Sequence, residues 1–359
     1  MGVGIKGFIL LTVVGVAAWL ALAALPDSAR AEGKAPAAAA TRLWTNVTAN
    51  VGGDKWGYAG VCLLTAVPDS DEVIAGVSEA GLWQTSDGGK TWKKLGEKDA
   101  VQIQNRPYQI LFDPKDAKTF WVSGSYKAPG VFKTVDAGQT FVSLGNANVD
   151  GIAIDFIDPQ RKTIVVGHHE QDRAVDKSTD GGKTWSKIGD KLPEQTNFTS
   201  DCLVFDAKTF VVNTAGWKQE NGKQLPFGIY RTEDAGATWK KVSDAGPSGP
   251  PCVASDGTIY WQTLWNTGLI KSANKGATWE KLDGPIKANP IEIAGGKLIA
   301  PVEKQLYISA DAGKIWQKLG PELPFKPNGI ICTAKSHVIY AWRSSETKED
   351  NVISRWEMP

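Results

Sequence analysis

Short apolar runs recur along this chain of 359 residues, and each is followed by a tight turn and a second strand-forming segment. Gly81-Leu82-Trp83 and Gly228-Ile229-Tyr230 are two such runs. The turn reads Ser/Thr-x-Asp-x-Gly-x-Thr-Trp, and we call this motif the box. Its Asp can accept hydrogen bonds from the turn backbone, and its Gly can adopt the positive φ angle that other residues resist. With strand-forming residues on both sides, each unit is predicted to be a β-hairpin.

The box occurs six times, so internal repetition organises the chain. The copies begin at residues 85, 134, 178, 232, 272 and 309. Intervals of roughly 40 to 50 residues suit a four-stranded propeller blade, in which the hairpin at the box supplies the third and fourth strands. The residues at the Asp position, which we expect to be structural, are Asp87, Asp136, Asp180, Asp234, Asn274 and Asp311.

The first two strands of a blade should precede its box, and suitable segments do so. Residues 151–156 and 163–167, for example, lead to the third box. After the sixth box the chain supplies three strand-like segments, and residues 43–47 resemble the strand that follows each box. We therefore expect an all-β, seven-bladed β-propeller of four-stranded blades, with the last blade closed by the N-terminal strand. Closure removes free strand edges. Six blades and a tail are the alternative.

The box resembles the Asp-box, or BNR, repeat of sialidases, sortilin-type receptors, xyloglucan-active hydrolases and photosystem II assembly factors. This resemblance covers most of the chain after its N-terminal segment. It implies that the boxes are structural and lie on the face opposite the ligand site. The substitutions agree with a structural role, because Phe141, Asn274 and Ile315 replace the usual Trp, Asp and Thr.

The N-terminal segment has the features of an export signal. Lys6 precedes an apolar run over residues 7–25, and Ala29-Arg30-Ala31 offers a cleavage site. We expect a signal peptide over residues 1–31, an Ala-rich spacer over 32–40 and the propeller over 41–359. The apolar run is also long enough to span a bilayer, so a retained N-terminal anchor is the alternative. Both interpretations predict an exported protein, periplasmic or extracellular.

The charge balance excludes one class of partner, and the cysteines suggest a cross-link. With 40 basic and 39 acidic residues, the net charge of +1 gives no field that would attract nucleic acid. Four cysteines in an exported protein permit disulfides. Side chains alternate along a strand, so Cys62 and Cys332, one register step apart on adjacent blades, are the favoured pair. For Cys202 and Cys252, buried free thiols are equally compatible with the sequence.

In a propeller of this type, the ligand face carries the loops that enter each innermost strand and the loops that join the second and third strands. Aromatic rings beside carboxylates, amides and arginine in these loops favour sugar recognition. Alternatively, the aromatic side chains fold back over the blades. The candidate ligand-binding residues are Trp56, Tyr58, Arg106, Tyr126, His168, His169, Glu170, Trp217, Trp265, Asn266 and Arg343.

Two carboxylates are candidates for catalysis. Asp150 and Asp201 occupy matching positions in adjacent blades, and inverting glycoside hydrolysis uses carboxylates roughly 6.5–9.5 Å apart. A structural role at the strand starts is the alternative. The adjacent His168 and His169 should point in opposite directions on an extended strand, so a shared metal is not expected. We predict no metal and no cofactor.

We therefore expect a monomeric protein that recognises a carbohydrate, and the sequence leaves open whether it is also a glycoside hydrolase. Sialidases carry an Arg-Ile-Pro motif before the first box, whereas Arg106-Pro107 follows the first box here and lacks the Ile. Sialidase activity is therefore not expected. The alternative function is a non-catalytic scaffold or assembly factor that binds a protein partner, including a membrane protein. The chain itself would contact a membrane only through a retained anchor.

Overall fold

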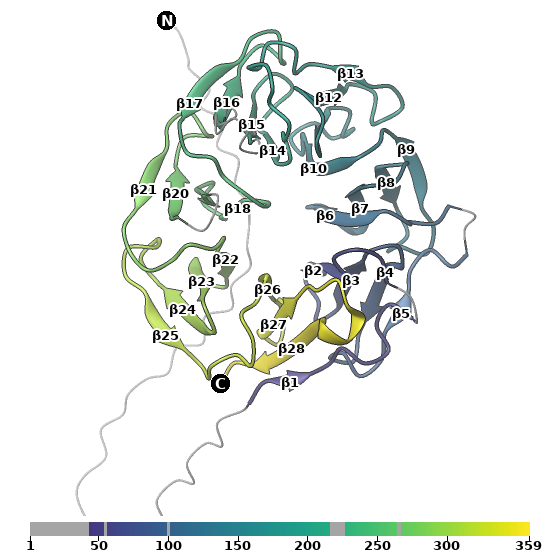
Figure 1. The fold of residues 1–359 in the computed structure, drawn as a ribbon, viewed down its shortest axis with the longest axis vertical. Coiled ribbons are helices and arrows are strands. Elements are labelled where there is room, and N and C mark those ends of the chain that lie inside the picture. The colour runs from purple at the N-terminus through teal and green to yellow at the C-terminus, as the bar shows by residue number, and fades with distance from the viewer. Residues whose placement is uncertain (1–42, 54–55, 99–100, 216–226, 264–266) are drawn as a thin grey trace, which may run out of the picture. The chain divides into compact units, whose positions relative to one another are not determined.

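The computed structural model describes residues 43–53, 56–98, 101–215, 227–263 and 267–359. Residues 41–359 form one compact unit. Seven antiparallel sheets of four strands are arranged in a ring (Figure 1). The predicted seven-bladed propeller is therefore confirmed.

We number the blades along the chain. Blades one to three contain β2 (Val61–Ala66), β3 (Val73–Val77), β4 (Gly81–Thr85) and β5 (Lys93–Lys94), then β6 (Arg106–Asp113), β7 (Asp116–Ser125), β8 (Val131–Thr134) and β9 (Val142–Gly145), then β10 (Val149–Ile154), β11 (Ile164–His168), β12 (Val175–Ser178) and β13 (Ser186–Lys187). Blades four and five contain β14 (Cys202–Val204), β15 (Phe210–Thr214), β16 (Gly228–Thr232) and β17 (Lys240–Ser243), then β18 (Cys252–Val253), β19 (Ile259–Gln262), β20 (Leu269–Ser272) and β21 (Glu280–Leu282). Blade six contains β22 (Ile291–Ile293), β23 (Lys297–Val302), β24 (Gln305–Ser309) and β25 (Gln317–Leu319). Blade seven contains β26 (Gly329–Cys332), β27 (Val338–Arg343), β28 (Val352–Glu357) and β1 (Thr45–Asn46), with the 3₁₀ helix η2 (Lys348–Asp350) before β28.

The N-terminal strand closes the ring, as the sequence predicts. β1 pairs antiparallel with β28, with Thr45 opposite Arg355 and Asn46 opposite Ser354. The pairing continues past β1, because the Val47 amide donates to the Ile353 carbonyl at 2.8 Å. The two ends of the propeller unit therefore share one sheet.

The middle strands of the blades form the core. All residues of β3, β11 and β15 are buried, because each sheet is covered on both faces by its neighbours. β3 is apolar throughout, while β11 and β15 begin with apolar runs and carry polar residues only at their ends, His168 and Asn213-Thr214. The hydrophobic clusters bridge blades: Ile74 of blade one packs in one cluster with Phe120 and Phe141 of blade two.

The Asp of each box ties its turn together. In the third box, Asp180 accepts hydrogen bonds from the Thr184 amide at 2.9 Å, the Thr184 hydroxyl at 2.6 Å and the Ser178 hydroxyl at 2.8 Å. These donors favour the ionised carboxylate and lower the pKa of Asp180 to about 2. Asn274 makes the corresponding bonds in the fifth box, where its Nδ2 donates to Thr278. The box is thus a local device that does not require a charge.

The Gly of each box packs against the preceding blade. A Cβ atom at Gly236 would lie 2.7 Å from the Cβ of Ile188, which follows β13 of the blade before. At Gly89 the corresponding neighbour is Val47 beside β1, at 2.6 Å, so the N-terminal strand takes part in the same contact. Three tryptophans add a hydrogen bond from their indole nitrogen to the preceding blade: Trp92 to Val47, Trp185 to Leu144 and Trp239 to Ile188.

All four cysteines are free, so the predicted disulfide between Cys62 and Cys332 is absent from the structure. The prediction assumed regular alternation along β2, but the register of β2 shifts between Val61 and Leu63, and Cys62 occupies the irregularity. Its thiol donates to the Gly60 carbonyl, while Cys332 packs in the cluster between blades six and seven. Burial raises the pKa of Cys62 to about 12 and that of Cys332 to about 11.

The predicted signal peptide or anchor (1–31) and the spacer (32–40) lie outside the described residues. Within the part of the chain that the structure describes, no helix has the length and apolar character needed to cross a membrane.

Contact between blades can be measured with two glycines of similar backbone geometry. Gly236 (φ +93°) faces Ile188, whereas Gly257 (φ +84°) would have no neighbour within 4 Å of a new Cβ. Both alanine variants are destabilised by the positive φ, but only Gly236→Ala also overpacks the contact with Ile188. We expect Gly236→Ala to lose about 1–3 kcal/mol more unfolding free energy than Gly257→Ala in urea denaturation. Equal losses would show that the box glycine does not couple the blades.

The boxes should also make stability sensitive to acid. The folded-state pKa of Asp180 is about 2, below its ordinary value, so its contribution is present above about pH 4 and is lost as the pH falls towards 2. Asp180→Asn should reduce this acid sensitivity, and Asn274→Asp should increase it. Melting temperatures between pH 2 and pH 7 test both variants. Plots of melting temperature against pH that run parallel for the two variants would show that the box carboxylate does not cause the acid sensitivity.

Candidate functional site

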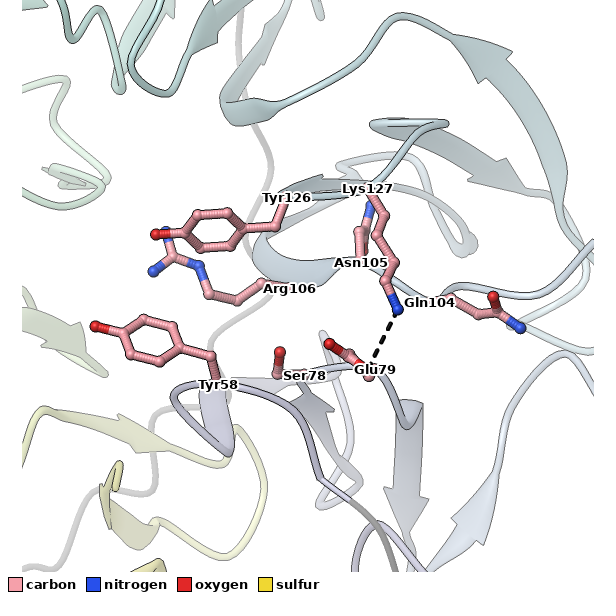
Figure 2. A pocket seen from close by; sticks show the side chains of 8 residues that line it. All are labelled: Tyr58, Ser78, Glu79, Gln104, Asn105, Arg106, Tyr126 and Lys127. Carbon is pink, nitrogen blue, oxygen red and sulfur yellow. Dashed lines mark ion pairs between the residues drawn. The ribbon is translucent and has the colours of Figure 1, made fainter. Parts of the chain in front are cut away.

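A pocket of about 320 Å³ lies between blades one and two, at the end of the propeller opposite the boxes (Figure 2). Its walls come from the loop before β2, the turn after β3, the entry to β6 and the loop after β7. Figure 2 shows Tyr58, Arg106 and Tyr126 extending in the same direction, while Lys127 and Glu79 form an ion pair at 3.2 Å. The lining residues are Tyr58, Ser78, Glu79, Gln104, Asn105, Arg106, Tyr126 and Lys127.

Three predicted ligand-binding residues therefore meet in this pocket. The rings of Tyr58 and Tyr126 are 6.1 Å apart, edge to face, and the two residues are 57% and 52% exposed. The Arg106 guanidinium lies 4.8 Å from the centre of the Tyr126 ring, a distance suited to a cation–π contact. The pocket thus offers exposed aromatic faces beside a fixed positive charge.

The position of Tyr126 is enforced by its neighbours. Its φ angle of +71° is unusual for a bulky residue, because the left-handed region favours glycine. The Asn148 side chain accepts a hydrogen bond from the Tyr126 amide at 2.9 Å, and the Tyr126 hydroxyl lies 3.1 Å from Nε2 of His169. A strained, half-exposed aromatic residue that is held from several sides is a typical feature of a binding site.

Asp150, on β10, is buried behind this pocket, with 1% exposure. Its carboxylate lies 2.8 Å from Nδ1 of His169 and accepts a hydrogen bond from the Ser200 hydroxyl at 2.8 Å. Nη2 of Arg106 lies 3.6 Å from the other oxygen. From the interior, Asp150 therefore contacts Arg106 directly and Tyr126 indirectly, through His169.

Asp201, immediately before β14, is equally buried. It accepts hydrogen bonds from the Tyr108 hydroxyl at 3.0 Å and from the Asn213 side chain at 3.2 Å. Burial raises the pKa of Asp201 to about 7, the negative charge of Asp150 adds to this rise, and the Tyr108 hydrogen bond opposes it. The neutral carboxylic acid is thus favoured in the folded state.

The two carboxylates belong to adjacent blades that approach closely. A Cβ atom at Gly151, next to Asp150, would lie 3.0 Å from the Cα of Asp201 and closer still to the Ser200 carbonyl. Glycine is required there because the backbones leave no room for a side chain. Neither Asp150 nor Asp201 lines the pocket. Because both carboxylates are buried, neither is exposed to a substrate in the pocket.

His168 has a different environment from His169. It is buried, and its ring nitrogens lie 3.0 Å from the Ala147 carbonyl and 3.1 Å from the Asp176 carboxylate. The two neighbouring histidines thus have separate sets of partners. Among the described residues, no group of His, Cys, Asp or Glu side chains is arranged to hold a metal ion.

The remaining predicted residues that the structure describes do not line the pocket. Trp56 packs against the cluster of blades one and seven, with Nζ of Lys348 5.5 Å from its ring. Arg343 donates to the Asp350 carbonyl, and Glu170 is exposed beside His169. Trp217, Trp265 and Asn266 lie outside the described residues.

The ligand-binding residues predicted from the sequence omit five lining residues: Ser78, Glu79, Gln104, Asn105 and Lys127. Ser78 and Glu79 form the short turn between β3 and β4, which is the counterpart in blade one of the loop that holds Tyr126. Aligning the second-to-third-strand loops of the blades would have identified this turn.

Asp201 should give stability a second dependence on pH. Its folded-state pKa is raised to about 7, so the stability associated with its neutral form is present below about pH 4 and is lost as the pH rises towards 7. Asp201→Asn removes this titration, and its melting temperature should therefore decline less than that of the wild type between pH 4 and pH 7. Identical pH profiles would show that Asp201 is ionised in the folded protein throughout.

Comparisons with known proteins agree with this architecture. The BNR/Asp-box repeat model matches residues 177–187, which include the third box. The chain is 26% identical over 194 residues to a xyloglucanase of Paenibacillus sp, covering 51% of this chain and 17% of that protein. It is 27% identical over 290 residues to sortilin of Rattus norvegicus, covering 75% of this chain and 32% of that protein. The chain thus spans less than a third of the length of either relative.

Among solved structures, YCF48 bound to a D1 peptide superposes with a TM-score of 0.54 at 14% identity, covering 89% of this chain and 97% of the other. At this identity the similarity shows the fold. Six boxes, seven four-stranded blades and the match to the repeat model together show that this protein is a BNR/Asp-box repeat propeller.

Proposed function

We propose that this protein is an exported propeller that binds a carbohydrate in the pocket between blades one and two. The observation that carries the proposal is the pair of half-exposed rings, Tyr58 and Tyr126, placed around Arg106 at the pocket. A pocket of about 320 Å³ is at the lower end of the range for small-ligand sites.

The chemistry of the lining suits a sugar ring. Its apolar C–H face can stack on an exposed tyrosine, while its hydroxyl groups need donors and acceptors in fixed positions. Arg106 supplies several N–H donors, and Gln104 and Asn105 supply amides. Similarity to a protein named xyloglucanase adds support for a carbohydrate ligand.

Recognition without hydrolysis is the activity that this arrangement supports. Asp150 and Asp201 are each 1% exposed, and neither lines the pocket. Glu79 is the carboxylate among the described lining residues, and it is paired with Lys127. A hydrolase of the usual kind needs two carboxyl groups that reach the scissile bond from opposite sides. The proposed location, outside the cytoplasm, rests on the signal-like residues 1–31.

A peptide is the second candidate ligand. The solved propeller that matches this chain over 97% of its own length is bound to a peptide. Exposed tyrosines, an arginine and the Lys127–Glu79 pair also suit the backbone and charges of a polypeptide. This alternative would make the protein a scaffold or assembly factor with the same binding face.

The test is a glycan array, followed by titration calorimetry with xyloglucan oligosaccharides and any other glycan that binds. Tyr58→Ala and Tyr126→Ala should each weaken binding at least tenfold, because each removes a stacking surface. Ile157→Ala is the control, since Ile157 is an exposed apolar residue outside the pocket. It should leave the affinity unchanged.

Two outcomes would contradict the proposal. Glycan binding that survives both tyrosine substitutions would place the ligand elsewhere. No glycan binding by the wild type, together with capture of a peptide that depends on Tyr126, would favour the scaffold function.

A further inference from the structure

A chain of three polar groups runs from the interior to the pocket. The carboxylate of Asp150 lies 2.8 Å from Nδ1 of His169, and Nε2 of His169 lies 3.1 Å from the Tyr126 hydroxyl. Exposure rises along this chain, from 2% for the Asp150 side chain and 12% for His169 to 52% for Tyr126. Only Tyr126 lines the pocket.

The direction of each hydrogen bond follows from the chemistry of the groups. An ionised carboxylate can only accept, so Nδ1 of His169 must carry a proton and donate it to Asp150. The charge of Asp150 is already balanced by Arg106, whose Nη2 is 3.6 Å away, so a neutral imidazole completes the local charge balance. Nε2 then holds a lone pair, and the Tyr126 hydroxyl must donate to it.

We propose that Asp150 and His169 are positioning residues that fix the polarity of the pocket: they consume the hydroxyl proton of Tyr126, so Tyr126 presents an acceptor to the ligand. This inference rests on the proposed function for its ligand. It assigns Asp150 a role in binding specificity, although Asp150 does not reach the pocket.

The pocket therefore selects a ligand that brings a hydrogen-bond donor to Tyr126. Neighbouring hydroxyl groups on a neutral saccharide meet this requirement, since each hydroxyl can donate while also accepting from Arg106. A saccharide whose hydroxyls are replaced by ethers keeps the acceptors but loses the donors.

The charged groups that face His169 are Asp150 from β10 and Arg106 from β6.

Three further titratable groups lie around this chain. Glu170, which follows His169 in the sequence, and Tyr58 both interact electrostatically with Tyr126. Asp201 interacts in the same way with Asp150. They change the local field without forming the two bonds that define the polarity.

The direct test is ¹⁵N-edited NMR of the imidazole rings in the ligand-free protein. The chain has three histidines, and His168→Gln and His169→Gln assign the signals. At pH 7.5 we expect His169 to be protonated at Nδ1 only, the less common neutral tautomer. Protonation of His169 at Nε2 would overturn the inference, whether or not a saccharide binds.

The functional test uses calorimetry at pH 7.5 with xyloglucan oligosaccharides, or the strongest glycan from the array. Tyr126→Phe keeps the ring but loses the acceptor, so it should bind at least fivefold more weakly than the wild type. The melting temperature of the variant shows whether it is folded.

The outcomes separate this inference from the proposed function. Glycan binding that depends on the Tyr126 ring, but is unchanged in Tyr126→Phe, would overturn the polarity inference and leave the proposed function intact. Failure of every glycan to bind would remove the proposed function, and the NMR result would still decide the tautomer of His169.

Discussion

Six of the seven blades carry a box, and the box glycine packs against the preceding blade with no room for a side chain. Gly236 against Ile188 and Gly89 against Val47 show the same contact at two points of the ring. The Asp of the box makes this possible, because its hydrogen bonds hold the turn in the conformation that brings the glycine forward. One local motif thus sets both the turn and the spacing between blades, and the N-terminal strand joins the ring through the same contact.

The candidate site depends on that spacing, although it lies at the opposite end of the blades. Arg106 and Tyr126 come from blade two, Asp150 and His169 from blade three, and Tyr58 from blade one. Their contacts, between 2.8 and 6.1 Å, require the three blades to keep a fixed separation. Gly151, whose missing side chain lets blade three approach blade four, extends the same principle to the ligand end. Rigid repeats therefore support a site assembled from several loops.

The sequence was sufficient for the fold because the box is a local signal, with each Asp and Gly acting within a few residues. The site was less predictable because its properties arise between blades. Asp150 and Asp201 were identified as a pair, but their burial depends on residues such as Tyr108 that come from another blade. The disulfide was predicted from strand alternation, which an irregularity at Cys62 interrupts. The sequence predicts Trp56 to be a ligand-binding residue in a loop, but its side chain packs against the core.

The central claim is that the ligand binds between blades one and two, against Tyr58 and Tyr126. A crystal structure of the protein in complex with an oligosaccharide that binds it tests this claim most directly. We predict a sugar ring stacked on one of the two tyrosines, with a hydroxyl group within hydrogen-bond distance of the Tyr126 oxygen and another near Arg106. A ligand bound on the face of the boxes, or at the ligand end without contact to either tyrosine, would contradict the account.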